Sequence, residues 1–101
     1  MSKSIVIVGA FVEIIELAEE NELVILGLID NLKKNNYLGY PILGKDNDAS
    51  SLFSRYNNNP LIISPDIPAI REKLHNYYNH IGFLFARLIS QGAKVSKSAQ
   101  I

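Results

Sequence analysis

The residues best suited to bind a ligand are a glycine and an aspartate that each end an apolar run. Gly9 closes the run that begins at Ser4, and Asp30 follows Gly9 by 21 residues, after a second run. A glycine before a helix exposes backbone N–H groups to a pyrophosphate, and an acidic residue after the next strand accepts hydrogen bonds from a ribose. This spacing indicates a nucleotide site, although Asp30 and Asn31 fit an ordinary turn equally well.

A second polar group, Ser64, Pro65 and Asp66, follows a third apolar run. Asp66 is also a good N-cap for the next helix, whose first turn contains Pro68. The two roles are compatible, because binding sites of parallel sheets form at the carboxyl ends of the strands. We therefore predict one pocket formed by Gly9, Ala10, Phe11, Asp30, Asn31, Ser64, Pro65 and Asp66.

No other group of residues in the sequence indicates catalysis or metal binding. His75 and His80 are five residues apart, so they do not share a helix face as an i, i+4 metal pair does. Only Gly9 remains of the three-glycine dinucleotide fingerprint, which makes an NAD-binding dehydrogenase half the weakest hypothesis. We expect no catalytic residue, no metal and no cofactor in this chain.

The elements that position these residues follow from the hydrophobic pattern. Residues 4–8 predict a strand, because Ser4 is followed by a continuous apolar and β-branched run at 5–8, which is typical of a central strand in a parallel sheet. Residues 11–21 predict a helix, because Phe11, Ile14, Ile15 and Ala18 share one face. With a second strand at residues 23–29, this segment predicts a βαβ unit.

The rest of the chain repeats the alternation of strands and helices. We predict a loop at residues 31–48 with one short strand at 40–44, a short helix at 49–56 and a third strand at 61–64. A helix capped by Asp66 then buries a stripe of Ile67, Ile70, Leu74, Tyr77 or Tyr78, and Ile81, and ends at Gly82. A fourth strand at residues 83–89 completes an α/β fold, a small Rossmann-like open parallel sheet with flanking helices.

From Ile89 onward the pattern changes. Ile89, Val95 and Ile101 are six residues apart, and Ala93 and Ala99 each lie two residues before the next aliphatic residue. This spacing is typical of hexapeptide β-helix repeats, although a chance match over two repeats is the alternative. We predict one domain at residues 1–89, and at residues 90–101 the first repeat residues of a β-helix whose remainder is not present in this chain.

The composition limits the classes of partner. The chain has 101 residues, of which 48% are hydrophobic, and this is enough for one domain with a buried core. Ten basic and ten acidic residues cancel, so neither nucleic acid nor an anionic membrane surface is expected as a partner. The chain has no cysteine and no apolar run long enough to span a bilayer, and we expect a cytoplasmic location.

Five stretches of the chain, in this order and spacing, resemble the N-terminal domain of the PglD/NeuD-like sugar acyltransferases. The resemblance implies that residues 1–89 are a Rossmann-like domain that binds a nucleotide-sugar acceptor, such as a UDP-linked amino sugar. In that family a left-handed β-helix follows, which binds acetyl-CoA, supplies a catalytic histidine and forms a homotrimer. The stretches are residues 5–10, 24–31, 39–44, 63–74 and 82–101.

The chain departs from this family at its first loop. The family pattern is glycine, alanine, a small residue, glycine and histidine; Gly9 and Ala10 match it, but Phe11, Val12 and Glu13 do not. Glu13 adds a negative charge to the first helical turn, which repels a phosphate there. The alternative hypothesis is therefore a degenerate domain kept for packing or oligomer contacts, and whether the chain belongs to an enzyme stays open.

Overall fold

The computed structural model of the chain describes residues 3–65 and 67–86, and it confirms the predicted α/β fold. A five-stranded sheet has the order β3-β4-β2-β1-β5. The strands are β1 (Ser4–Val8), β2 (Val24–Ile29), β3 (Asn36–Tyr37), β4 (Tyr40–Gly44) and β5 (Leu61–Ile63). The helices are α1 (Val12–Glu20), α2 (Ala49–Tyr56) and α3 (Pro68–Ile81), with a 3-10 turn, η1 (Asp46–Asp48), before α2.

Four of the five strands run parallel. β1 pairs with β2 on one side and with β5 on the other, and β2 pairs with β4. From β1 the chain moves outward to β2 and β4 and then returns to β5, on the opposite side of β1. Such a reversal of strand order leaves a crevice at the carboxyl ends of the strands, because the following segments diverge to opposite faces.

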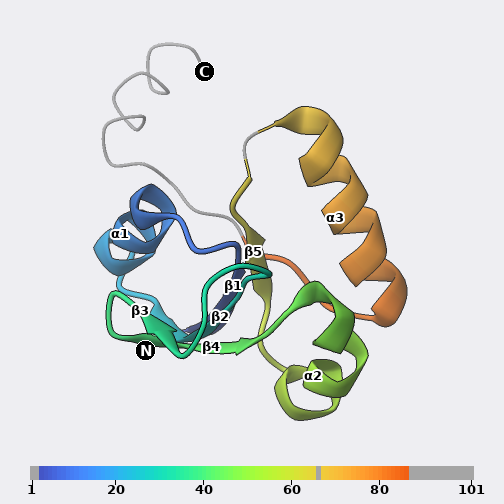
Figure 1. The fold of residues 1–101 in the computed structure, drawn as a ribbon, viewed down its shortest axis with the longest axis horizontal. Helices are drawn as coiled ribbons and strands as arrows, with labels where there is room; N and C mark the ends of the chain where they lie inside the picture. Colours follow the sequence, from blue (N-terminus) through green and yellow to red (C-terminus); the bar gives the residue numbers. More distant parts are fainter. Residues whose placement is uncertain (1–2, 66, 87–101) are drawn as a thin grey trace.

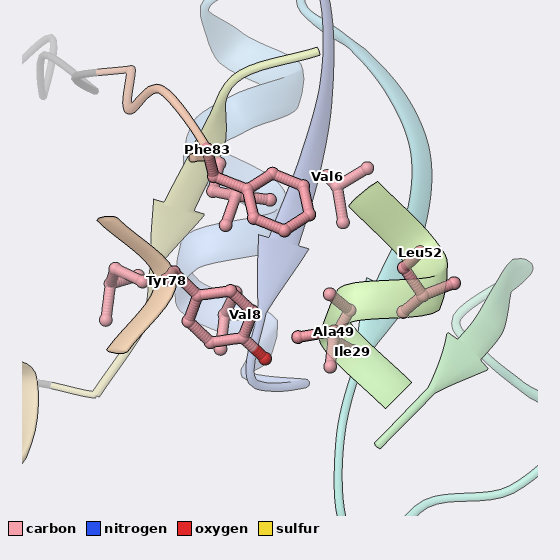
Figure 2. Close-up of a cluster of buried hydrophobic side chains, with 9 residues drawn as sticks. Val6, Val8, Ile29, Ala49, Leu52, Tyr78 and Phe83 are labelled. Atoms are coloured by element: carbon pink, nitrogen blue, oxygen red, sulfur yellow. The ribbon is translucent and has the colours of Figure 1, made fainter. Parts of the chain in front are cut away.

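Both faces of the sheet are buried, which explains why β1 is apolar at every position after its first residue. Ile5 and Ile7 pack in a cluster with Ile15 and Ala18 of α1, whereas Val6 and Val8 point to the opposite face. Figure 1 shows α1 on one side of the sheet and α2 and α3 on the other. In Figure 2 the second face is filled by Val6, Val8, Ile29, Ala49, Leu52, Tyr78 and Phe83.

The segment 31–48 contains more structure than the predicted loop with one strand. β3 pairs antiparallel with β4, and the two residues between them, Leu38 and Gly39, have φ of 52° and 88°. Positive φ at both central residues is the geometry of the tight hairpin turns. Because leucine seldom adopts positive φ, the sequence here lacks the usual hairpin signal, and β3 was not predicted.

The two longer helices begin one residue later than the sequence suggests. Phe11 is the N-cap of α1, outside the helix, with φ of −118°. The N-cap of α3 is Ile67, not Asp66, and it makes no side-chain cap hydrogen bond. Asp66 itself lies outside the described residues. Pro68 is the first residue of α3, where its missing N–H costs nothing.

The apolar stripe of α3 is only half buried, contrary to the prediction. Tyr78 is fully buried between β1 and α2, but Ile67, Ile70 and Tyr77 are 59%, 45% and 41% exposed. Phe11, predicted to face the core, is 47% exposed. These apolar side chains lie near the carboxyl end of the sheet instead of under it.

The fourth predicted strand is reduced to one bridge within the described residues. Phe85 pairs parallel with Leu61, and Ala86 N–H donates to the Leu61 carbonyl. The proposed β-helix residues, 90–101, lie outside the described residues. Within the part of the chain that is described, no helix combines the length and apolar character needed to cross a membrane.

Candidate functional site

A pocket of about 440 Å³ lies at the carboxyl end of the sheet. The segments that end all four parallel strands contribute to it, together with the start of α1 and the first half of α3. It is where the strand order reverses, the place that parallel α/β sheets offer to ligands. Its described lining consists of Val8, Gly9, Phe11, Ile29, Asp30, Asn31, Leu32, Asp46, Pro65, Ile70 and Leu74.

Asp30 connects the ends of β1 and β2. Its Oδ1 accepts a hydrogen bond of 3.0 Å from the backbone N–H of Ala10, and its Oδ2 accepts bonds from the N–H groups of Leu32 and Lys33 at 2.9 and 2.7 Å. Burial acts to raise the pKa of this carboxyl, but the three backbone N–H groups and the charge of Lys33 outweigh it and lower the pKa. Asp30 is therefore a charged group that holds the β1–α1 loop through Ala10, and it also forms the ordinary turn after β2 through Leu32 and Lys33.

Gly9 and Phe11 line the pocket just before the start of α1. Gly9 has φ of 99°, and a Cβ placed there would lie 3.0 Å from the Phe11 ring and 3.2 Å from Ser64 Cβ. Phe11 therefore covers Gly9, the residue expected to expose its backbone to a phosphate. α1 has no side-chain cap, and Glu13 adds an acidic group to its first turn.

Ser64 does not line the pocket but is hydrogen-bonded to two residues that do. It is buried, its Oγ donates to the Gly9 carbonyl at 3.2 Å, and its N–H donates to the Val8 carbonyl at 2.9 Å. Pro65 lies in the lining itself. Of the predicted residues, Gly9, Phe11, Asp30, Asn31 and Pro65 line one pocket, Ala10 and Ser64 are hydrogen-bonded to its wall, and Asp66 is outside the described residues.

Asp46 is a polar lining residue that was not predicted from the sequence. Its carboxylate accepts hydrogen bonds from the Asn31 amide and the Tyr78 hydroxyl, and its N–H donates to Asn31 Oδ1. Burial first, and then the bond to Asp46 and the charges nearby, raise the pKa of Tyr78 far above its ordinary value. The position of Asp46 along the chain could have identified it as a site residue, because Asp46 follows β4 closely, as Asp30 follows β2.

The outer wall of the pocket is apolar. Ile70 and Leu74 of α3 line it, together with Leu32, which is 86% exposed. An adjoining pocket of about 400 Å³ shares Asp46, Ile70 and Leu74 and includes Lys73 and Tyr77. The arrangement is suited to hold a ligand with an apolar ring, but within the described lining no serine, histidine or lysine is present as a nucleophile or base.

Comparison with known proteins places the fold but no family. No family model matches the chain, and none of the curated proteins matches it. One solved structure, the acetyltransferase domain of PglB from Neisseria gonorrhoeae FA1090 in complex with acetyl coenzyme A, is similar with a TM-score of 0.67 and 18% identity. The similarity covers 82% of this chain and 42% of that structure, so the chain spans less than half of it. At this identity the likeness concerns the fold, which is one found in an acetyltransferase domain.

Proposed function

We propose that this domain binds the sugar acceptor of an acetyltransferase in the pocket at the carboxyl end of the sheet. A UDP-linked amino sugar is the ligand that the family resemblance implies. The observation that carries the proposal is the convergence of four strand-end segments on one pocket, within a fold that is also found in an acetyltransferase domain.

In this proposal the chain contributes binding and not the transfer of the acetyl group. The described lining includes no basic side chain that would pair with the phosphates of acetyl-CoA. We therefore assign the cofactor, the catalytic histidine and the trimer contacts to a β-helix of a longer protein. Asp30, held by three backbone N–H groups, is the rigid acceptor toward a ligand hydroxyl.

Isothermal titration of the chain with UDP-linked amino sugars and with the free sugars tests the proposal. Binding is expected for the wild type, and Ile70→Asp is expected to weaken it by about tenfold or more, because the new charge enters an apolar wall. Ser54→Asp adds the same charge at an exposed position of α2 outside this pocket and serves as the matched control. Absence of heat at millimolar concentrations of every sugar would refute the proposal.

A packing or oligomerisation module is the second candidate, and a separate observation favours it. Four large apolar side chains are exposed at or next to the two adjoining pockets: Leu32, Ile70 and Tyr77 line them, and Ile67 lies three residues before Ile70. Exposed apolar patches of this kind mark contact sites between proteins. Light scattering discriminates the two, because this candidate predicts a mass of at least two chains that falls to one chain in Leu32→Ser/Ile70→Ser.

A further inference from the structure

The polar groups of the pocket are almost entirely hydrogen-bond acceptors. Asp30 and Asp46 present carboxylates, which accept and do not donate when ionised. Both ends of the Asn31 amide are already bonded to Asp46, through Nδ2 to Oδ2 at 3.0 Å and through Oδ1 to the backbone N–H at 2.9 Å. A complementary ligand therefore brings O–H or N–H donors, whereas phosphate oxygens are themselves acceptors.

Three features at the β1–α1 loop act against a phosphate there. The Phe11 ring lies against Gly9, closer than 3.5 Å to the position of a Cβ on that glycine. The N–H of Ala10 is already donated to the Asp30 carboxylate. Glu13 places a negative charge in the first turn of α1, where a phosphate would otherwise meet the positive end of the helix dipole.

The charged side chains around the pocket also disfavour a phosphate. Its lining, as far as the structure describes it, contains two carboxylates and no lysine, arginine or histidine. The charge of Lys33 helps to lower the pKa of Asp30, but Lys33 does not line the pocket. Its ammonium group lies 5.3 Å from the centre of the Tyr37 ring. Lys73 belongs to the adjoining pocket along α3. A diphosphate in the main pocket would thus face two negative charges without a cation in the lining.

We propose that the pocket holds the uncharged, hydroxyl- or N–H-bearing ring of its ligand and excludes phosphate from the β1–α1 loop, with Phe11 as the specificity-determining residue. This inference rests on the proposed function, because it specifies which part of an activated sugar occupies the site. The nucleoside or sugar ring packs against Phe11, Ile70 and Leu74 and donates to the carboxylates. The diphosphate lies outside the main pocket.

Titration of the wild-type chain with uridine, N-acetylglucosamine and UDP tests the first half of the inference. UDP is expected to bind no tighter than uridine, because its phosphates gain no partner. A tenfold preference for UDP over uridine, about 1.4 kcal/mol, would overturn the inference while leaving the proposed function intact. If none of the three binds, the inference that the ring occupies the pocket is overturned, whereas the proposed function is decided separately by the titration with UDP-linked amino sugars.

The second experiment uses inorganic pyrophosphate and follows the backbone amide resonances of residues 9–13. The wild type is expected to show no saturable shift at millimolar pyrophosphate, and Phe11→Ser is expected to gain one. Serine is a preferred N-cap residue and Phe11 is 47% exposed, so this variant should fold. Phe11→Tyr keeps the ring and should behave as the wild type. Saturable shifts in the wild type, or none in Phe11→Ser, would overturn the assignment of Phe11.

Discussion

Replacing Asp30 by alanine should destabilise the fold by about 2 kcal/mol, most of it through a single backbone group. The Ala10 N–H that bonds Asp30 belongs to a buried residue, only 8% exposed, and an alanine at position 30 leaves that N–H without its acceptor. A buried donor without an acceptor costs about 1–3 kcal/mol. The N–H groups of Leu32 and Lys33 belong to exposed residues, so water replaces Asp30 there at little cost.

The stabilisation by Asp30 depends on pH with a defined sign. Its pKa in the folded chain lies below the ordinary value of 3.8, because backbone N–H groups and Lys33 favour the charged form more than burial disfavours it. A group with a depressed folded pKa stabilises fully above its unfolded pKa and loses this effect as the pH falls through the folded pKa. The difference between wild type and Asp30→Ala should therefore be constant near neutral pH and shrink below about pH 4.

Urea unfolding followed by far-ultraviolet circular dichroism at pH 7 and pH 3 measures both effects. Asp48→Ala is the matched control, because Asp48 also accepts a backbone N–H, from Lys45 at 2.8 Å, but at an exposed position. We expect that control to cost less than about 1 kcal/mol. Equal losses in the two variants, or a difference between wild type and Asp30→Ala that grows on acidification, would refute the reasoning.

Three further substitutions test the packing around the site, each by urea unfolding. Gly27→Ala should cost about 1–3 kcal/mol, because its Cβ would lie 2.5 Å from Leu43 Cγ. Combining it with Leu43→Ala should recover part of this loss. If the losses of the two single variants simply add in the double variant, the clash is refuted. Tyr78→Phe should cost about 1–2 kcal/mol by removing the bond to Asp46, and an unchanged midpoint would show that the bond contributes nothing. Gly9→Ala should cost about 1–3 kcal/mol at its φ of 99°, and a neutral result would exclude strain there.

The central part of the fold was predictable because burial on both faces leaves a clear trace in the sequence. The run at residues 5–8 has no polar side chain on either face, and this pattern suits a strand covered by helices on both faces. The positions of Gly9, Asp30 and Ser64 were predictable for a related reason, since these residues directly follow β1, β2 and β5. The carboxyl ends of parallel strands meet at one edge of the sheet, so residues that are far apart along the chain come together there.

Asp46 and β3 escaped prediction because their signals depend on pairing. β4 was predicted as a strand at residues 40–44, but it contains Pro41 and is only partly buried, so the sequence does not show which strand it pairs with. Once β4 pairs with β2, the rule that identified Asp30 applies equally to Asp46. The information was therefore present in the residue types, but it became interpretable only after the partner strand was known.

The exposed half of α3 shows a limit of a different kind, because periodicity gives the apolar face of a helix but not the length of the surface beneath it. α3 has 14 residues and is about 21 Å long, whereas β5 has three residues and spans about 10 Å. The first turns of α3 follow the carboxyl end of β5, so Ile67 and Ile70 extend past the strand that the helix packs on. The same overhang supplies the apolar wall of the pocket. A stripe that looks like core in the sequence is thus divided between the core and the wall of the pocket by the shortness of a single strand.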